Sequence, residues 1–253
     1  EVYDLHNDLL AIEHTDRLSS FDRHICDVPG KGHILTETSA FWFSRIDIPN
    51  HYVFSEGNTM IVKKCTVIPI EVVVRGYITG STQTSLWTHY KKGTRNYCGV
   101  KFPDGLVKNQ KLERNVITPT TKAEVDELIT PKEIVERGIV NQEEWEYISK
   151  QALRLFNMGQ MYADSRGLIL VDTKYEFGRD SNGKILLIDE VHTCDSSRYW
   201  LQKSYEARMS ENKEPEKYDK DIIRDYVKKN VKDPYKKKTF NIPKTVVKKT
   251  YDT

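Results

Sequence analysis

The stretch GLILVDTKYEFGRDSNGKILLIDEVHTCDSSRYW, residues 167–200, decides the fold of this chain. It opens with an apolar run of strand-forming residues, Leu168–Val171, which leads directly into three charged residues, Asp172, Lys174 and Glu176. Side chains two apart in a strand share a face. The pattern therefore predicts a strand that carries all three charges on one side.

A turn and a returning strand follow. The sequence Asp180-Ser181-Asn182-Gly183 is typical of a turn, because Asn and Gly accept a left-handed backbone. Residues 184–188 are largely apolar and end at the acidic pair Asp189-Glu190. We expect a β-hairpin in which Asp189 lies on the charged face of the first strand.

Carboxylates at the ends of apolar strands need compensation, because a buried charge is costly unless it is paired or bound to a metal. Only Lys174 and Arg198 stand against four acids, which are Asp172, Glu176, Asp189 and Glu190. An excess of carboxylate oxygens suits Mg²⁺, which proteins usually hold through one or two carboxylates together with phosphate oxygens. A polar hairpin face with cross-strand salt bridges is the structural alternative, and the hairpin alone leaves both open.

A second informative stretch is VIPIEVVVRGYITGSTQTSLW, residues 67–87. Its alternation places Glu71 and Arg75 on one face of a strand. The turn Gly80-Ser81-Thr82 follows, and backbone N–H groups, hydroxyls and a guanidinium fork can together hold a phosphate. The structural alternative is a surface ion pair between Glu71 and Arg75, worth under about 1 kcal/mol.

Length and composition describe an ordinary globular protein. The chain has 253 residues, of which 38% are hydrophobic and 30% charged, enough for one large domain or two packed lobes. No apolar run approaches the roughly 20 residues that cross a bilayer, so we expect no association with a membrane. The cysteines at 26, 65, 98 and 194 show no C-x-x-C spacing, which favours a reducing, cytoplasmic location.

Charge is distributed unevenly along the chain. Residues 228–253 hold nine Lys and two Asp, so this tail carries +7 while the whole chain carries +2. A cluster of basic residues confined to one tail does not indicate a nucleic-acid partner. We interpret the lysines of this tail as part of a solvated surface. Serine- and zinc-hydrolase functions lack support, because the sequence has no G-x-S-x-G motif and no histidine pair at metal-ligand spacing.

Other patterns predict the surrounding elements. Residues 2–13 are expected to form a β-hairpin, and residues 35–46 a helix after a turn at Pro29–Gly32 that could also cradle an anion. A bend before Pro69 would join two sheet-rich halves, and ligand pockets favour such interfaces. Asn141 caps a long helix whose apolar stripe belongs to the core, and an amphipathic helix is expected near residues 218–227.

Four motifs together resemble one family. Ile68–Ser81 (IPIEVVVRGYITGS) and Val171–Gly178 (VDTKYEFG) resemble the two signatures of the SAICAR synthetases, which are phosphoribosylaminoimidazole-succinocarboxamide synthases. Asp189–Trp200 (DEVHTCDSSRYW) and Pro29–Phe43 (PGKGHILTETSAFWF) are also similar to stretches of that family. The motifs occur in the family's order over roughly residues 1–227.

The resemblance implies an ATP-dependent ligase of purine biosynthesis. Its members join L-aspartate to the carboxylate of carboxyaminoimidazole ribonucleotide, with ATP as co-substrate and Mg²⁺ as cofactor. Because a carboxylate is a poor acyl donor, transfer of the γ-phosphoryl group to it would give an acyl phosphate that the aspartate amine attacks. Catalysis of this kind consists mainly of positioning and charge neutralisation.

The resemblance also implies a fold and its partners. The fold would be α+β with two lobes, similar to protein kinases, in which residues 1–66 form a small β-rich ATP-binding lobe. Residues 67–253 would form the larger lobe with the substrate and metal site. The partners would be small molecules, and the chain would be a monomer or a small homo-oligomer.

Each matching side chain acquires an implied role. Mg²⁺ and the ATP phosphates would be held by Glu176 and Asp189. The rest of the ATP would be received by Lys64 and by the bend near Val67. The 5′-phosphate of the ribonucleotide would be bound by Arg75, Ser81 and Arg198. Catalytic roles around the ribose and the imidazole carboxylate would fall to Asp172, Lys174 and Glu71. The substrate-binding set would be completed by Lys122 and Asp195.

Three features depart from the family pattern. Members have a Gly-Lys-containing strand just before the position of Glu1 that contributes to the ATP-phosphate loop, so we expect this chain to lack its natural start. Cys194 stands where proline is usual, which loosens the approach to Asp195 without removing a ligand. The lysine-rich tail stops before the family's terminal helix, which leaves subunit contacts there open.

Two other functions compete with the ligase. A small-molecule kinase of related fold would share the ATP and Mg²⁺ residues but would not need the phosphate contacts of Arg75, Ser81 and Arg198. A regulatory nucleotide-binding module without catalysis would have lost the metal acids, whereas Glu176 and Asp189 are both present.

Overall fold

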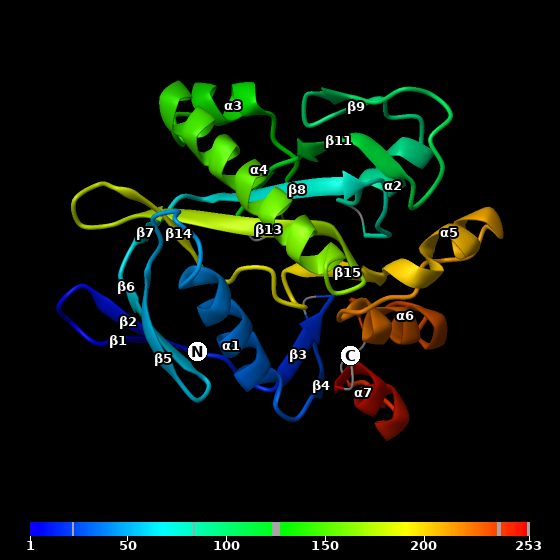
Figure 1. Ribbon diagram of the computed structural model, residues 1–253, viewed down its shortest axis with the longest axis horizontal. Helices are drawn as coiled ribbons and strands as arrows, with labels where there is room; N and C mark the ends of the chain where they lie inside the picture. Colours follow the sequence, from blue (N-terminus) through cyan, green and yellow to red (C-terminus); the bar gives the residue numbers. More distant parts are fainter. Residues whose placement is uncertain (22, 83, 123–126, 237–238, 252–253) are drawn as a thin grey trace.

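The computed structural model describes residues 1–253 apart from 22, 83, 123–126, 237–238 and 252–253, and the side chain of residue 251 is also left undescribed. Helices and antiparallel sheets are mixed along the chain (Figure 1), in agreement with the predicted α+β class.

A four-stranded sheet in the order β1-β2-β6-β5 occupies the N-terminal part. The elements of this part are β1 (Val2–Asp4), β2 (Leu9–Glu13), β3 (Arg17–Ser20), β4 (Arg23–Asp27), α1 (Lys31–Phe43), β5 (Tyr52–Glu56) and β6 (Thr59–Lys63). The predicted hairpin over residues 2–13 is confirmed, with Val2 paired to Ile12. Helix α1 packs on β5 and β6, and the side chains of Met60 and Val62 are fully buried.

The larger sheet has seven strands, and β13 is its central member. Its strands are β7 (Thr66–Val67), β8 (Ile70–Tyr77), β11 (Lys111–Ile117), β12 (Thr120–Thr121), β13 (Leu168–Arg179), β14 (Ile185–Ile188) and β15 (Ser197–Leu201). The predicted hairpin is confirmed as β13–β14, with Arg179 paired to Ile185. Its turn is closed by the Asp180 carboxylate, which accepts from the backbone N–H groups of Asn182 and Lys184.

The remaining elements, which are mostly helices, lie on this sheet and at its ends. The remaining elements are α2 (Leu86–Lys91), β9 (Asn96–Tyr97), β10 (Val100–Lys101), α3 (Pro131–Glu136), α4 (Gln142–Asp164), α5 (Gln202–Ser210), α6 (Asp221–Asn230) and α7 (Lys244–Tyr251). Helix α4 crosses the sheet (Figure 1) and is capped by Asn141, as the sequence predicts; the structure adds a capping box with Glu144. Its predicted apolar stripe is buried, including Trp145, Leu155 and Phe156.

One hydrophobic core joins the two sheets. It includes Trp42 of α1 and Met60 of β6 together with Phe156 of α4 and Tyr175 of β13. The N-terminal sheet is therefore anchored to the larger one through shared apolar packing. The division of the chain at residue 66 stays a prediction.

Two helices differ in extent from the sequence prediction. Helix α1 begins at Lys31 rather than at residue 35, because the Asp16 carboxylate accepts from the N–H groups of Gly30 and Gly32 at 3.0 Å each. These N–H groups are thus engaged by a side chain, which agrees with a turn rather than an anion cradle. Helix α6 spans Asp221–Asn230 instead of residues 218–227.

The C-terminal helices pack against the β3–β4 hairpin rather than extending away from the body. Leu18 and Ile25 of the hairpin form a buried cluster with Ile223 and Val227 of α6, and Val246 of α7 packs on its edge. The lysine-rich tail thus has an apolar face in addition to the predicted solvated one. Within the described ranges, no helix is both long enough and apolar enough to cross a membrane.

Candidate active site

The charged face of β13 is the centre of the site. Tyr175 and Phe177 point into the core, so alternation places Asp172, Lys174 and Glu176 on the opposite face, as the sequence predicts. A cavity of about 260 Å³ lies over this face and is lined by residues that include Glu71, Arg75, Asp172, Lys174, Asp195 and Arg198. Most of the predicted site residues are thus brought together.

Lys174 is surrounded by carboxylates. Its Nζ lies 3.3 Å from Glu71 Oε1 and 3.7 Å from Asp189 Oδ2, and it also bonds Glu176. Lys122 bonds the other oxygen of Glu176, whose side chain is only 3% exposed. We call these five residues the acidic end, because three carboxylates face two lysines.

Electrostatics at the acidic end favour an added cation. Burial raises the pKa of Asp189, and the charge of Glu176 raises it further. Although burial acts in the opposite direction, Lys174 and Lys122 hold the pKa of Glu176 below its ordinary value. The two carboxylates therefore repel each other and depend on lysines for neutralisation.

The carboxylate ligands at the acidic end fit an Mg²⁺ ion that is also bound to phosphate, and not an ion that protein ligands alone enclose. In the described part of the chain, no three His, Cys, Asp or Glu side chains gather as a metal centre. Glu176 and Asp189 nevertheless provide two carboxylates. Proteins commonly hold Mg²⁺ through one or two carboxylates when phosphate oxygens supply other ligands.

The backbone of Asp189 explains how it reaches this cluster. Glu176 is paired with Ile188 in the β13–β14 ladder, so regular alternation would send Asp189 to the opposite face, beside Tyr175. Asp189 instead has a left-handed backbone with φ of 69°, and its carboxylate lies beside Lys174. The prediction that Asp189 lies on the charged face is confirmed, but alternation is not the reason.

At the other end of the same face, Asp172 lies between two guanidinium groups. Its Oδ2 is 3.2 Å from Arg75 Nη1 and 2.7 Å from Arg198 Nη1, and Arg198 Nε donates to Asp221 at 3.1 Å. Arg75 also donates to Thr118 at 2.8 Å. Because Asp172 holds both arginines, their positions are fixed relative to β13.

The structural alternative, a surface ion pair between Glu71 and Arg75, is not the arrangement that the structure shows. Glu71 contacts Lys174 and accepts from Thr120 at 2.8 Å, whereas Arg75 turns to Asp172. Arg75 is also buried, with 6% of its surface exposed. Glu71 therefore belongs to the acidic end, whereas Arg75 belongs to the cluster around Asp172.

A cavity of about 400 Å³ continues beyond Arg198, which lines both cavities. Five cationic side chains and three acids line it: Lys108, Arg198, Lys217, Lys228 and Lys229 with Glu214, Asp221 and Asp225. Thr79 and Ser81 add hydroxyl groups, and Lys228 bonds Ser81. We call this cavity the cationic end, and its composition suits an anion with several oxygens.

Asp195 stands between the two ends with one carboxylate oxygen unused. Its Oδ2 lies 2.9 Å from Lys31 Nζ and 3.8 Å from Lys220 Nζ, while its buried Oδ1 has no partner among the described residues. Burial would raise the pKa of Asp195, but Lys220 and Lys31 hold it below its ordinary value. Asp195 is therefore a charged acceptor facing the 260 Å³ cavity. Next to it, burial raises the pKa of the Cys194 thiol to about 12.

Two predicted ATP-binding residues lie away from these clusters. Lys64 Nζ pairs with Asp4 at 2.6 Å on the N-terminal sheet, where about half of each side chain is exposed. Val67 is 43% exposed and pairs with Gly178 near the far end of β13. Neither lines the cavities at the acidic or cationic end.

Several site residues were missed by sequence reasoning. They come from α6 and its approach and from α1: Lys220, Asp221, Arg224, Lys228 and Lys31. On α6, residues 221, 224 and 228 share a face at helical spacing, a signal that was read only as amphipathicity. Lys31 was seen in the Gly-Lys-Gly turn, but its pairing with Asp195 depends on tertiary packing.

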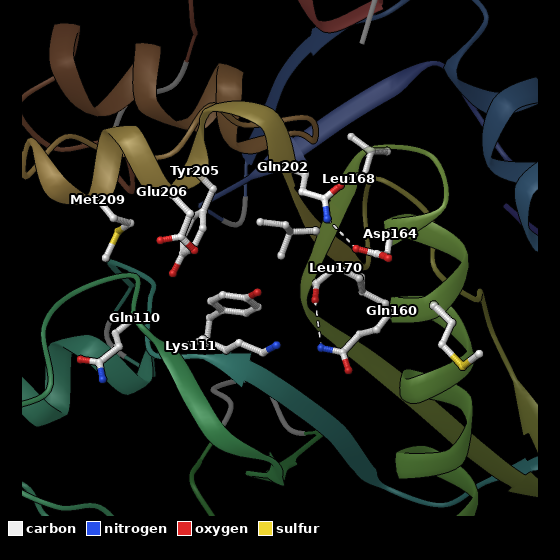
Figure 2. Close-up of a pocket in the computed structure, with 13 residues that line it drawn as sticks. Gln110, Lys111, Gln160, Asp164, Leu168, Leu170, Gln202, Tyr205, Glu206 and Met209 are labelled. Carbon is white, nitrogen blue, oxygen red and sulfur yellow. Dashed lines mark hydrogen bonds between the residues drawn. The ribbon is translucent and has the colours of Figure 1, made fainter.

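A larger cavity, of about 740 Å³, lies apart from the site (Figure 2). Residues of β8, β11, α4, β13 and α5 line it, among them Lys111, Gln160, Asp164, Tyr205 and Glu206. The Gln202 side chain donates to Asp164 across its wall. It contains none of the predicted site residues.

Known proteins resemble this chain over most of its length. The family model for SAICAR synthetase matches residues 1–242. This chain belongs to the SAICAR synthetase family. It is 56% identical to the chloroplastic phosphoribosylaminoimidazole-succinocarboxamide synthase of Arabidopsis thaliana, over 93% of this chain and 58% of that protein. It is 53% identical to the enzyme of the same name from Legionella pneumophila, over 93% of this chain and 76% of that protein.

Solved structures agree with the family assignment. SAICAR synthase from Saccharomyces cerevisiae, in complex with SAICAR, has a TM-score of 0.83 at 32% identity, covering 99% of this chain and 88% of that one. A SAICAR synthetase in complex with ADP has a TM-score of 0.73 at 25% identity, covering 100% of this chain and 96% of that one. The resemblance and the α+β fold predicted from the motifs are confirmed. The chain spans little more than half the length of the Arabidopsis relative.

Proposed function

We propose that this chain is the ATP-dependent ligase that joins L-aspartate to 5-amino-1-(5-phosphoribosyl)imidazole-4-carboxylate and forms SAICAR in purine biosynthesis. Its relatives carry the name of that enzyme. The observation that carries the proposal is that the acidic end on β13 and the separate cationic end are linked through Arg198, which pairs with Asp172 of β13 and lines both cavities. A kinase would need the first and not the second.

The acidic end would receive Mg²⁺ and ATP. Glu176 and Asp189 would hold the ion, which neutralises phosphate charge when bound. Lys174 lies within reach of all three carboxylates, and their charges hold its pKa above the ordinary value although burial lowers it. It therefore stays protonated and would stabilise negative charge on the substrate carboxylate during phosphoryl transfer. Glu71 would position Lys174, and Lys122 would give up its bond to Glu176.

The cationic end would anchor the 5′-phosphate of the imidazole ribonucleotide. Arg198, Ser81 and Lys228 face this cavity and can supply charge-assisted hydrogen bonds. Arg75 lines the neighbouring cavity, where Asp172 holds it close to Arg198. The ribonucleotide would thus extend across both cavities, with its carboxylate beside Lys174.

The environment of Asp195 suggests where L-aspartate binds. Asp195 lines the 260 Å³ cavity, and its carboxylate would accept a hydrogen bond from the substrate's ammonium group. Lys220 and Arg224 line the same cavity and can pair with the two substrate carboxylates. This placement would bring the amine toward the activated imidazole carboxylate.

The proposal is tested by incubating the chain with ATP, Mg²⁺ and the imidazole ribonucleotide, with and without L-aspartate, and by measuring ADP and the amide product. We expect amide formation in proportion to ADP and dependence of both on aspartate. ADP release that never requires aspartate and yields no amide would support the kinase alternative instead.

Location and assembly stay predictions. A cytoplasmic location was inferred from cysteine spacing, and two plant relatives are named as chloroplastic. A monomer or small homo-oligomer is expected, and analytical ultracentrifugation would decide between them.

A further inference from the structure

A separate cavity, the one of about 740 Å³ in Figure 2, shares no described lining residue with the cavities at the acidic and cationic ends. Its walls come from β8, β11 and β13 and from helices α4 and α5. Its volume lies within the range of about 300–1,000 Å³ that is typical of small-molecule sites. A ligand here would therefore leave the residues of the proposed active site uncovered.

The hydroxyl group of Tyr77 is unpaired and faces this cavity. Tyr77 is 6% exposed, and its ring centroid lies 5.2 Å from that of Trp200 and 5.7 Å from that of Tyr205 in edge-on contacts. Its hydroxyl oxygen bonds no described residue and is not among the polar atoms that are shut off from solvent. Because Tyr77 lines the cavity, this accessible hydroxyl opens into it. The Tyr205 hydroxyl, by contrast, donates to the Asn109 carbonyl oxygen at 2.9 Å.

Two further donors face the same space. The side-chain oxygen of Gln160 accepts from Asn115 at 2.7 Å, which directs the amide nitrogen of Gln160 toward the cavity. That nitrogen carries two protons, and one of them makes a long bond of 3.5 Å to the Leu170 carbonyl oxygen. Lys111 has no ion-pair partner in the described part of the chain, and its nitrogen points toward that of Gln160 (Figure 2). Donors that converge in this way leave a place for an anionic group.

Two carboxylates lie on other walls of the cavity. Asp164, the last residue of α4, accepts from the Gln202 amide at 2.5 Å, which orients the carboxylate and leaves its second oxygen available. Glu206 comes from α5 and lies on the other side of the cavity (Figure 2). Burial, together with the charges of Glu206 and Asp164, raises the pKa of Tyr77 to about 12, so its hydroxyl keeps its proton and remains a donor.

The charges of the lining residues restrict the ligand. Lys111 carries one positive charge, and Asp164 and Glu206 carry one negative charge each. A ligand with one carboxylate and one ammonium group would pair with Lys111 and Asp164, and the remaining charge of Glu206 would repel a second carboxylate. Aliphatic and thioether side chains, of which the latter adapt to the shape of a ligand, also line the cavity: Leu168, Ile169, Met161 and Met209.

We propose that this cavity binds a free α-amino acid with an uncharged, apolar side chain. The carboxylate of the ligand accepts from Lys111, Gln160 and Tyr77, and its ammonium group donates to Asp164. Its side chain packs on the aliphatic and thioether wall. Because Glu206 repels a second carboxylate, the site is distinct in ligand as well as in place from the one proposed for L-aspartate.

The two charged contacts are tested by calorimetric titration with L-phenylalanine, with L-phenylalanine amide, which lacks the carboxylate, and with 3-phenylpropanoate, which lacks the ammonium group. We expect L-phenylalanine to bind about tenfold more tightly than either analogue, the effect of one charge-assisted contact. Lys111→Met should remove the preference over the amide, and Asp164→Asn the preference over 3-phenylpropanoate. No binding of L-phenylalanine, or preferences that survive in these variants, would overturn the proposal.

The location is tested with a conservative variant and a matched control. Tyr77→Phe removes only the unpaired hydroxyl and should weaken L-phenylalanine binding about tenfold. Lys101 is exposed on β10 and does not line the cavity, so Lys101→Met should bind as the unchanged chain does. Unchanged affinity in Tyr77→Phe, or equal losses in Lys101→Met and Lys111→Met, would place the ligand elsewhere.

Two further titrations test the apolar wall and the independence of the site. Glycine has the same two charges without a side chain and should bind at least about tenfold more weakly than L-phenylalanine, because it buries no apolar surface. Saturating Mg²⁺–ADP and L-aspartate should leave L-phenylalanine binding intact. Equal binding of glycine would contradict the role of the apolar wall, and displacement by ADP or L-aspartate would contradict a separate site.

Discussion

The acidic end and the cationic end are linked through Asp172 on the charged face of β13 and its partner Arg198, but they differ in charge. At the acidic end, Glu71, Glu176 and Asp189 face Lys174 and Lys122. At the cationic end, five cations outnumber three acids. β13 supplies Lys174 and Glu176 to the acidic end, whereas no residue of β13 lines the cationic end.

Neighbouring elements decide the sign of each end. In addition to Glu176 of β13, the acidic end gains Glu71 from β8 and Asp189 through its left-handed backbone. The cationic end gains Lys228 and Lys229 from α6. Under the proposed function, the acidic end would hold a metal-bound phosphate and the cationic end a free phosphate.

The largest expected effect comes from removing a carboxylate at the acidic end. Glu176→Gln should lower kcat/KM for Mg²⁺–ATP by about 100-fold, because it deletes a metal-binding charge. Steady-state kinetics at limiting Mg²⁺ check this. Glu113→Gln on exposed β11 is the control and should have no effect. Unchanged turnover in Glu176→Gln would remove this residue from the metal site.

A smaller effect is expected at the cationic end. Arg198→Ala should raise KM for the imidazole ribonucleotide by about 10- to 100-fold, because it removes a charge-assisted phosphate contact worth about 1.5–3 kcal/mol. KM for ATP should stay constant. Initial-rate measurements with each substrate varied in turn separate the two, and an effect confined to ATP would mean that the phosphate pocket is misplaced.

Lys228→Ala should act in the same direction but more weakly. Its ammonium group is a single charge at the cavity wall, so we expect KM for the ribonucleotide to rise by about threefold to tenfold. Lys232→Ala serves as the control, because Lys232 is exposed and does not line the cavity. Equal effects of the two substitutions would indicate a general charge effect rather than a phosphate contact.

The smallest expected effect concerns stability and pH. Burial and Glu176 raise the pKa of Asp189, so its contribution to stability is full below its unfolded pKa and is lost as pH rises through the folded value. Burial opposes ionisation of Asp221 too, but Arg198 and Arg224 lower its pKa. Its contribution is therefore present above the unfolded pKa and lost as pH falls.

Asn variants at these two positions should thus respond oppositely to pH. Relative to the unchanged chain, Asp189→Asn should gain stability as pH rises from about 4 to 7, whereas Asp221→Asn should lose stability as pH rises from about 2 to 5 and stay constant above that range. Urea unfolding at each pH measures both. The same pH trend in both variants would refute the assigned difference between the two ends.

The sequence predicted those features that depend on local pattern. Alternation and turn chemistry were sufficient for the β13–β14 hairpin, and a capping residue, Asn141, with an apolar stripe was sufficient for α4. The acidic end was foreseen because its residues are close in sequence or carried by a recognised motif. Local signals of this kind survive folding because tertiary contacts reinforce them.

Features that depend on distant packing were not predictable in the same way. Nothing near Lys31 indicates that it pairs with Asp195, because α1 must first dock beside the loop before β15. The structural alternative paired Arg75 with Glu71 on the same strand face, whereas Asp172 on the adjacent strand is the partner. Likewise, α6 joins the cationic end only because its apolar face packs on β3 and β4.

The most direct test of the two-ended site is a calorimetric comparison of ligand binding in Glu176→Gln and Arg198→Ala. Each variant is titrated with Mg²⁺–ADP and with ribose 5-phosphate. We predict that Glu176→Gln loses Mg²⁺–ADP and keeps ribose 5-phosphate, and that Arg198→Ala shows the reverse. If both variants lose the same ligand, the two ends are one site and the account is wrong.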